Sequence, residues 1–413
     1  MSEHLFTITS HIIHASHIRG YSRGVLILAH GIGSSKESYE PFLDQLLAHL
    51  PIRGAWACDV PHHAASYLLN QDIIGDEPHW LDSVIDMLHM VNLFAAQMPP
   101  PIYGIGQSWG CVNMLTRTSS SSHNVAFTPT PFRWHGTVIE PVFETGYRFQ
   151  RYGVEKPKEH SQHRMPLQAR RRDTWKAREE AAAKLRRTAY YAVFDPRVFE
   201  RVVKYDLRDM PTQQHPHAVT LTTPKAQEVY SYARPDPPFP VHEAAPDHNA
   251  RPENTVVVLG FYRGEVKHLK RVLPQTLPSI LYLWGAESII LFELFLASFD
   301  AAFRAARPVA RVKSSGNLSD VGNSAYAQRV IDQTGVGDEG NGGVATGKVQ
   351  SKHTKGAYHA VHLEMPRKAA EEVGKWLKKE LQKWHEEMMR RKEQPSFNPG
   401  VVNPLWLEKL SKL

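Results

Sequence analysis

A serine bracketed by glycines stands where an apolar run gives way to a helical segment. Residues 102–105 have the composition of a buried parallel strand, and helical character begins at Cys111. Between them lies Gly106-Gln107-Ser108-Trp109-Gly110, a G-x-S-x-G motif in a strand–turn–helix context. A turn of this kind is strained, and glycines keep its backbone uncrowded. We therefore predict that Ser108 projects from a sharp turn as a nucleophile.

The segments around this turn alternate between strand-like and helix-like patterns. Apolar runs predict buried strands over residues 25–29, 54–59, 136–141 and 279–285, and helical spacing predicts helices over 39–50, 79–98 and after Pro366. This alternation favours an α/β fold with a doubly wound, mostly parallel sheet. Because 413 residues exceed what one core usually supports, we expect one catalytic domain that carries a large insertion.

The insertion is expected between residues 147 and 250, where strand signals fade and arginine, lysine, histidine and proline accumulate. We predict a mainly helical cap with a helix over 174–187. The catalytic domain then comprises residues 1–146 and 251–392, and residues 393–413 form a C-terminal tail. Arg170-Arg171-Arg172 is compatible with an anionic substrate group, although a solvated helix start explains these arginines better.

Composition limits the classes of function. Charged residues make up 22% and apolar residues 42%, as in an ordinary soluble, intracellular globular protein. The net charge is +7, but no nucleic-acid-binding module accompanies it, so we expect no nucleic-acid partner. The most apolar run, residues 289–299, is too short to span a bilayer, so no transmembrane segment is expected. Cys58 and Cys111 provide no disulfide framework.

The strand over residues 25–29 runs into His30-Gly31-Ile32-Gly33, a usual place for an oxyanion donor when a nucleophile elbow follows. We predict that the backbone N–H groups of Ile32 and Trp109 hold the oxyanion. The Trp109 side chain is expected to line an apolar acyl pocket shaped by the cap.

Position must select the general base among 23 histidines. His359 follows a small-residue loop and precedes Glu364 by five residues, which resembles the G-H-x-x-P-x-E-x-P segment of α/β-hydrolases. In that family the histidine is the base, and the residue before it is usually glycine, where this chain has Tyr358. His362 is the competitor and His353 a distant third. A metal site on these histidines is not expected, because no third ligand stands at a suggestive spacing.

The acid of the triad has two candidates. In most α/β-hydrolases it is an aspartate three positions after the glycine that ends the penultimate strand, here Gly285. That position holds Ser288, and Glu287 stands one place earlier. The other location known in the family follows the preceding strand, where Glu140 lies. We therefore favour Glu140 and keep Glu287 as second choice.

A glycine-rich segment spans residues 334–348. It contains G-x-G-x-x-G at 335–340, but no apolar strand precedes it, and Val349 stands where a P-loop needs serine or threonine. We therefore expect a flexible loop and no nucleotide or other cofactor.

The chain ends in Ser411-Lys412-Leu413, which matches a receptor-read peroxisomal address. We predict a peroxisomal location and an import receptor as partner.

Taken together, His30-Gly31, the serine motif, Ile-Glu-Pro at 139–141, the cap segments RRRDTWKAREEAAAKLRR and LTTPKAQEVYSYARP, the glycine-rich loop and the terminal S-K-L resemble fungal peroxisomal α/β-hydrolases. That group includes hydrolases of host-selective toxin biosynthesis and, more distantly, the yeast peroxisomal lipase. The resemblance covers residues 25–384. It implies a Ser-acid-His hydrolase with a helical cap, in fungal secondary metabolism.

The primary prediction is a serine hydrolase that cleaves an acyl ester or thioester of lipid or polyketide type through Ser108, His359 and Glu140. One alternative keeps the triad but hydrolyses a carbon–carbon bond. Another is a hydrolase-fold protein that binds a small ligand without turnover, whose signature would be a broken triad.

Overall fold

A seven-stranded sheet organises the molecule. The computed structural model describes residues 10–14, 24–48, 50–76, 78–116, 135–139, 141, 168–235, 261–262, 265, 271–288, 327–338, 340–392 and 404–412. The strand order is β1 (Ser10–His14), β3 (Gly54–Cys58), β2 (Val25–Ala29), β4 (Ile102–Gln107), β5 (His135–Ile139), β11 (Ile280–Gly285) and β12 (Val349–Thr354). β1 pairs antiparallel with β3, and the other pairs of this sheet are parallel. The prediction of a mostly parallel sheet is confirmed.

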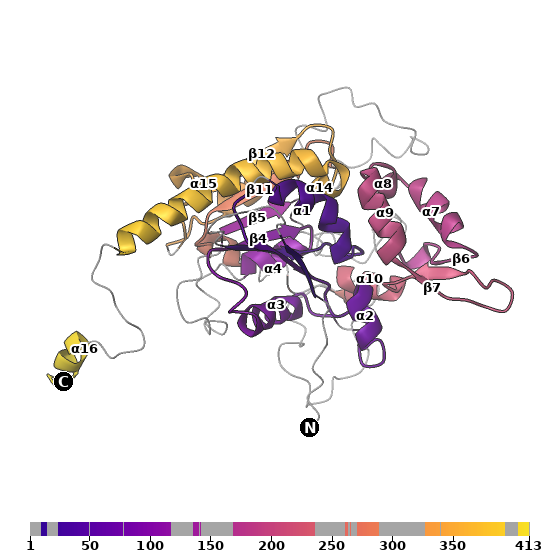
Figure 1. The fold of residues 1–413 in the computed structure, drawn as a ribbon, viewed down its shortest axis with the longest axis horizontal. Coiled ribbons are helices and arrows are strands. Elements are labelled where there is room, and N and C mark those ends of the chain that lie inside the picture. The colour runs from indigo at the N-terminus through magenta and orange to yellow at the C-terminus, as the bar shows by residue number, and fades with distance from the viewer. Residues whose placement is uncertain are drawn as a thin grey trace, which may run out of the picture.

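Helices cover both faces of this sheet (Figure 1). Successive strand residues point to opposite faces, so Leu26 and Leu28 belong to one buried cluster and Ile27 to the other. The first cluster includes residues of α1 (Glu40–Leu47) and α15 (Pro366–Lys392). The second includes residues of α3 (Asp82–Leu93) and α4 (Gly110–Thr116). Near-continuous apolar strands are what such two-sided burial requires.

The parallel strands bring the predicted site residues to one edge. β2, β4, β5, β11 and β12 point the same way, so the segments that follow them leave the sheet at the same edge. These segments carry His30-Gly31, Ser108, the stretch after Ile139, Glu287 and His359. Ligands of open α/β sheets bind at this carboxyl edge.

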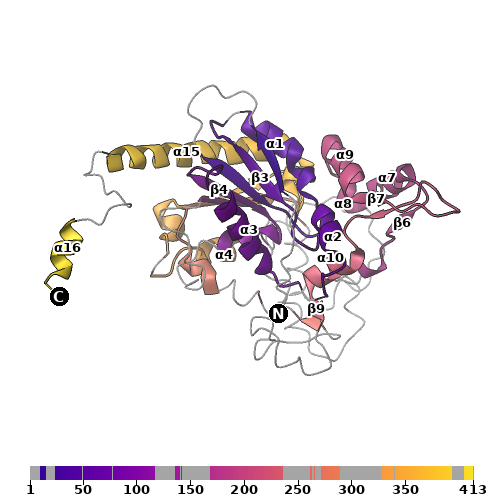
Figure 2. The same ribbon diagram turned by 60° about the horizontal axis from the view of Figure 1, so that its bottom comes forward.

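A second body of structure lies at one end of the sheet in both views (Figures 1 and 2). It contains α7 (Arg178–Arg186), α8 (Ala189–Ala192), α9 (Pro196–Tyr205), α10 (Lys225–Tyr232) and a small antiparallel sheet of β6 (Thr174–Trp175), β8 (Val219–Leu221) and β7 (Leu207–Asp209). The helix predicted from residue 174 was wrong at its start, because Thr174 and Trp175 pair with β8 and the helix begins at Arg178. The cap boundaries at 147 and 250 fall outside the described residues, so that division stays a prediction.

This second body of structure is hydrogen-bonded to the rest of the molecule on two sides. Near α9, the Asp195 N–H donates to the Leu363 carbonyl at 3.0 Å. Near α10, the Ala64 N–H donates to Thr223 Oγ1 at 2.8 Å, and the Trp80 indole N–H donates to the Ser231 carbonyl at 2.8 Å. Hydrogen bonds therefore connect this second body of structure to the sheet and its helices near both α9 and α10.

The glycine-rich segment has internal hydrogen bonds, and its predicted flexibility stays a prediction. Its centre is Asn341, a buried side chain that accepts from the Gly343 N–H at 2.7 Å and donates to the Pro278 carbonyl at 2.6 Å. The loop precedes β12 and therefore lies at the amino end of the parallel strands, away from the edge that carries Ser108.

The remaining elements are all short. They are η1 (Lys36–Tyr39), α2 (Ala64–Asn70), β9 (Arg234–Pro235), β10 (Phe261–Tyr262), η4 (Leu273–Gln275), η5 (Gly343–Thr346), α14 (Val361–Glu364) and α16 (Pro404–Leu410). Among the residues that the structure describes, no helix combines the length and apolar character needed to cross a membrane.

Candidate active site

Ser108 occupies a strained turn between β4 and α4. Its φ is +52°, and in the described part of the chain Ala64 is the only other non-glycine residue with positive φ. The turn is crowded: a Cβ on Gly110 would lie 2.2 Å from the Ala29 carbonyl oxygen, and one on Gly106 would lie 2.6 Å from the Gly110 oxygen. Only glycine fits at these two positions, which explains the spacing of the motif.

The strained turn is tied to the neighbouring strand. The Ser108 N–H donates to the Ile139 carbonyl, the last residue of β5, at 2.9 Å. On the other side, a Cβ on Gly31 would lie 3.3 Å from the Ser108 Cβ. The loop after β2 and the end of β5 therefore border the serine on opposite sides.

His30 and an ion pair fix the loop after β2. The Val60 N–H donates to His30 Nε2 at 3.2 Å, so the proton sits on Nδ1, which contacts the Gly31 carbonyl at 2.8 Å. Burial lowers the pKa of His30, which keeps the ring neutral. Farther along, Lys36 is 5% exposed and pairs with the fully buried Asp59 at 2.7 Å. These contacts hold the backbone that contains Ile32, one of the two predicted oxyanion donors.

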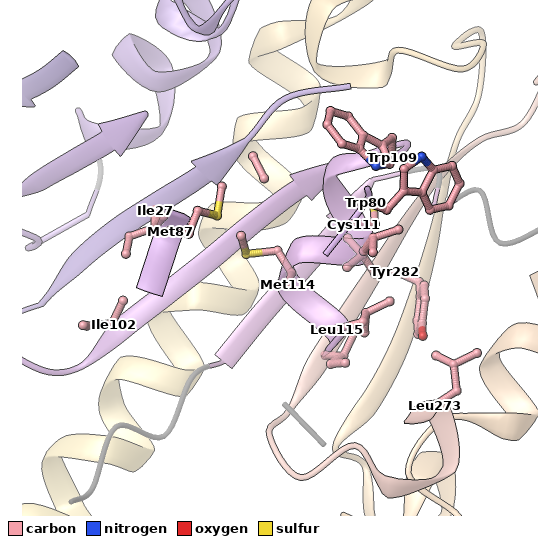
Figure 3. Close-up of a cluster of buried hydrophobic side chains, with 14 of the residues drawn as sticks. Ile27, Trp80, Met87, Ile102, Trp109, Cys111, Met114, Leu115, Leu273 and Tyr282 are labelled. Atoms are coloured by element: carbon pink, nitrogen blue, oxygen red, sulfur yellow. The ribbon is translucent and has the colours of Figure 1, made fainter. Parts of the chain in front are cut away.

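The Trp109 side chain does not lie where the sequence led us to expect. It is 1% exposed and belongs to the buried cluster on the α3 and α4 face, next to Trp80 (Figure 3). Its ring centroid lies 5.6 Å from that of His62 and 5.9 Å from that of His63. The expectation that this indole lines an acyl pocket was wrong, because the strained turn directs the side chain into the core. The backbone N–H of Trp109 remains beside Ser108.

Three histidines were considered as the base, and the structure puts them in different surroundings. His359 follows β12 and lies next to the nucleophile strand, with its Nε2 3.3 Å from Gln107 Nε2. Since an amide nitrogen only donates, His359 Nε2 is the acceptor and the proton sits on Nδ1. His353 is exposed within the edge strand β12.

His362 is a core residue. Its ring centroid lies 4.4 Å from that of Tyr39 and 5.9 Å from that of Phe42, and the residue is 0% exposed. Neither ring nitrogen has a hydrogen-bond partner within the described residues. Burial lowers the pKa of His362 to about 3, so the ring is neutral at physiological pH. An imidazole enclosed in this way cannot exchange protons with a substrate.

The two candidate acids follow different strands, Glu140 after β5 and Glu287 after β11. Glu140 lies outside the described residues, but Ile139, which precedes it, is bonded to the Ser108 N–H. Glu287 is described: its Oε2 accepts from the Gly356 N–H at 2.8 Å, and its own N–H donates to the Ala357 carbonyl at 3.0 Å. Glu287 therefore holds the backbone of the loop that leads to His359.

The three cap arginines do not share one environment. Arg170 and Arg172 are exposed, as a solvated helix start predicts. Arg171 differs, because its guanidinium pairs with Glu228 of α10. Glu228 is 2% exposed, and a Cβ on Gly33 would lie 3.2 Å from its Oε1. Burial raises the pKa of Glu228, and Arg171 opposes that rise. The pair joins the cap to the loop that contains Ile32.

Among the described residues, no group of three or more histidine, cysteine, aspartate or glutamate side chains is arranged to hold a metal ion. The described contacts place His359 beside Gln107, the residue that precedes Ser108.

Comparison with known proteins agrees with this geometry. The sequence matches the Alpha/beta hydrolase family profile over residues 26–372. The chain belongs to the alpha/beta hydrolase family. The match covers both parts of the sheet, and it confirms the predicted fold class and the prediction that this protein is a hydrolase.

Relatives and solved structures are similar along most of the chain. Two fungal proteins named type I acyl-CoA thioesterase mpaH are similar to this chain. The one from Penicillium brevicompactum is 26% identical over 95% of this chain and 92% of its own length. The one from Penicillium roqueforti is 28% identical over 70% of this chain and 76% of its own length. The peroxisomal alpha-beta-hydrolase Lpx1 from Saccharomyces cerevisiae has the same fold at 15% identity, with a TM-score of 0.56 over 98% of this chain and 96% of its own. E-2-(acetamidomethylene)succinate hydrolase aligns at 13% identity with a TM-score of 0.50, over 90% of this chain and the whole of its own.

Two residues near His359 were not singled out by sequence reasoning. Gln107 contacts the His359 ring, and Glu364 bonds the backbone on both sides of that histidine. The signals were present, since Gln107 adjoins the nucleophile and Glu364 belongs to the motif that selected His359. Nothing in the spacing alone shows what these side chains touch.

Proposed function

We propose that this enzyme hydrolyses an acyl ester or thioester of lipid or polyketide type through Ser108, His359 and Glu140. The observation that carries the proposal is the positive φ of Ser108 at the carboxyl edge of the sheet, because backbone strain of this kind clusters at active sites. The names of the two Penicillium relatives favour a thioester over an oxygen ester. Fungal secondary metabolism is the setting that we infer for the reaction.

The proposed reaction begins with proton transfer. His359 Nε2 takes the proton from Ser108 Oγ as the oxygen attacks the acyl carbon. The carbonyl oxygen becomes an oxyanion, held by the backbone N–H groups of Ile32 and Trp109. His359 then gives the proton to the leaving alkoxide or thiolate, and an acyl-enzyme remains. Water, deprotonated by His359, attacks the acyl-enzyme; the bond from the acyl carbon to Ser108 Oγ breaks, His359 returns the proton to Ser108 Oγ, and the carboxylic acid is released.

The Nδ1–H tautomer of His359 suits this role, because Nε2 is then free of a proton. The contact with Gln107 favours the same tautomer. An acid near Nδ1 would stabilise the imidazolium that forms during the reaction.

We assign the acid to Glu140, with Glu287 as second choice. The carboxylate of Glu287 already accepts from the Gly356 N–H, which supports a structural role for it. The variants Glu140→Gln and Glu287→Gln separate the two. The larger loss of kcat, on the order of 10³-fold or more, is expected for Glu140→Gln. Equal losses would leave the assignment without support.

The first test uses a fluorophosphonate probe, which reacts with activated serines. We expect the wild-type enzyme to be labelled and Ser108→Ala to remain unlabelled. Release of free thiol from a medium-chain acyl-CoA, compared with cleavage of the matching p-nitrophenyl ester, then distinguishes thioester from ester specificity. A well-folded wild type that neither labels nor cleaves any ester would favour ligand binding without turnover.

We further propose that Ser411, Lys412 and Leu413 direct the enzyme to peroxisomes through an import receptor. Ser411 and Lys412 are exposed beyond α16, which agrees with a receptor-read tail. A fluorescent protein fused to the N-terminus should collect in peroxisomes of a fungal host. Removing Leu413 should leave the fusion diffuse, and an unchanged distribution would contradict the proposal.

A further inference from the structure

The predicted oxyanion donor Ile32 lies in a tight turn with a glycine on each side. The Ser34 N–H donates to the Gly31 carbonyl at 3.3 Å, which closes a four-residue turn over residues 31–34. Gly33, the third residue of this turn, has a φ of +79°, as the third residue of a type II turn does. Ile32 is the second residue, so the direction of its N–H follows from where the turn is placed.

The two glycines put the turn in contact with different parts of the molecule. A Cβ on Gly31 would overlap Gln107 Oε1 and lie 3.3 Å from the Ser108 Cβ. A Cβ on Gly33 would lie 3.2 Å from Glu228 Oε1, 3.3 Å from its Cδ and 3.5 Å from its Oε2. The turn therefore touches the nucleophile through one glycine and the carboxyl group of Glu228 through the other.

The carboxyl group of Glu228 is itself held in place. Glu228 belongs to α10 and is 2% exposed, and its Oε1 pairs with the guanidinium of Arg171. The neighbouring residue of α10, Gln227, donates from its side-chain amide to the Gly75 carbonyl at 3.0 Å. Since a charge-assisted bond has a defined direction and buried groups are closely packed, a displaced carboxyl group would displace the turn that it touches.

The segments on either side of the turn are tied to the sheet. Before it, the Val60 N–H donates to His30 Nε2 at 3.2 Å. After it, the Lys36 N–H donates to Asp59 Oδ1 at 2.8 Å, and Lys36 Nζ donates to Asp59 Oδ2 at 2.7 Å. The contact with Glu228 acts between these two anchors, on the residue that follows the predicted donor.

We propose that Glu228, oriented by Arg171, is a positioning residue that places the turn of residues 31–34 so that the Ile32 N–H meets the oxyanion formed at Ser108. The inference rests on the function proposed above and adds a pair of residues to it. The effect of Glu228 on the reaction passes through Gly33. Because an oxyanion donor is effective only at hydrogen-bond distance, a small withdrawal of the turn would slow acylation.

The test compares Glu228→Ala, Arg171→Gln and the double variant, all assayed well below their melting temperatures. We expect Glu228→Ala to lower kcat and the rate of fluorophosphonate labelling about 10- to 100-fold, with KM within about 3-fold of wild type. The matched control is Glu200→Ala, which removes an exposed carboxylate from α9 and should match wild type in all three.

The double variant separates positioning from stability. Arg171→Gln leaves the buried Glu228 without its counter-ion, so its melting temperature should fall, and removing both partners should restore part of that loss. The kcat of the double variant should nevertheless stay within about 3-fold of that of Glu228→Ala, because Arg171 acts through Glu228. A purely structural pair would instead regain kcat together with stability.

Amide hydrogen exchange over residues 31–36 provides a readout that does not depend on turnover. Exchange in this segment should be faster in Glu228→Ala than in wild type and unchanged in Glu200→Ala. The inference would be overturned by wild-type kcat and labelling in Glu228→Ala, by recovery of kcat in the double variant, or by single losses that multiply in it. If the wild type itself neither labels nor hydrolyses, the proposed function has failed rather than this role of Glu228.

Discussion

The turn that carries Ser108 and the loop that carries His359 reach the same edge of the sheet, but they are built differently. The serine turn relies on the backbone alone, with a φ of +52° and glycines wedged against neighbouring carbonyls. The histidine loop has no positive φ at residues 357–360 and is held by two glutamate side chains. Substitution of a glycine in the serine turn is therefore expected to disrupt the turn severely. Loss of one glutamate from the histidine loop removes only part of the hydrogen bonding that holds that loop.

This difference matters for the chemistry that we propose. A nucleophile must be presented at a fixed point, because small displacements of the attacking atom are costly. A general base must exchange a proton with the serine in one step and with the leaving group in another, so it needs some freedom of movement. The rigid serine turn suits a nucleophile, and a loop held by hydrogen bonds suits a base.

The largest expected effect is on kcat, and it distinguishes His359 from His362 of α14. We expect His359→Gln to lower kcat on the order of 10³- to 10⁴-fold, because the proton acceptor is lost. His362→Leu should keep kcat within about 3-fold, since its ring is enclosed by Tyr39 and Phe42 and touches no reacting group. The measurement is steady-state thioester hydrolysis by both variants. A larger loss in His362→Leu, at equal folded fraction, would transfer the base assignment to His362.

The next effect concerns the serine turn. In Gly110→Ala the new Cβ would lie 2.2 Å from the Ala29 oxygen and 2.6 Å from the His30 oxygen, so the backbone must shift. We expect fluorophosphonate labelling to fall at least about 100-fold, because the oxyanion donors and the nucleophile move apart. The matched control is Gly75→Ala, where a Cβ would meet nothing within 4 Å. Labelling of Gly110→Ala at the wild-type rate would show that the turn is less rigid than its contacts imply.

A third effect uses the buried His362 as a reporter of stability. Its pKa is about 3 in the folded chain against an ordinary value of 6.5, so below pH 6.5 the unfolded chain binds a proton that the folded chain does not. Stability should therefore fall as the pH drops below 6.5, by as much as about 1.4 kcal/mol per pH unit from this residue. Urea unfolding at pH 7.5 and 5.5 should show a steeper loss for wild type than for His362→Leu. Parallel losses in the two proteins would mean that His362 is accessible to solvent.

The sequence predicted the parts of the molecule that follow a simple period or a strict steric rule. Apolar runs at residues 25–29 and 279–285 foretold buried strands, because parallel strands covered on both faces need continuous apolar composition. The glycines around Ser108 foretold the turn, because the packing there admits no other residue. The first strand of the cap sheet was missed, because Thr174 and Trp175 stand directly before a strong helical pattern and pair with a distant strand.

The surroundings of individual side chains were harder to predict. Trp109 follows Ser108 and is apolar, which suggested a side chain that lines a pocket. Its indole instead packs in the buried cluster beside Trp80, and no sequence pattern shows the direction in which a side chain leaves a turn. The hydrogen bonding of the glycine-rich loop depends on one buried side chain, Asn341, whose partners are brought together only by the fold. The contacts of Glu364 were hidden for the same reason, since its carboxylate accepts from the backbone amides of Tyr358 and Ala360.

The smallest effect tests the departure of this chain from its family at Tyr358, where glycine is usual. Tyr358 has no positive φ and is 39% exposed, so the histidine loop does not need glycine there. We expect Tyr358→Gly to change kcat less than about 3-fold and to destabilise the fold by about 0.5–1 kcal/mol, because glycine gains more freedom on unfolding. Thermal unfolding and steady-state hydrolysis measure both. A faster enzyme would mean that the tyrosine restrains the loop, and that the glutamates are not its main support. A nearly unchanged rate would show that the loop works equally well with either residue before His359.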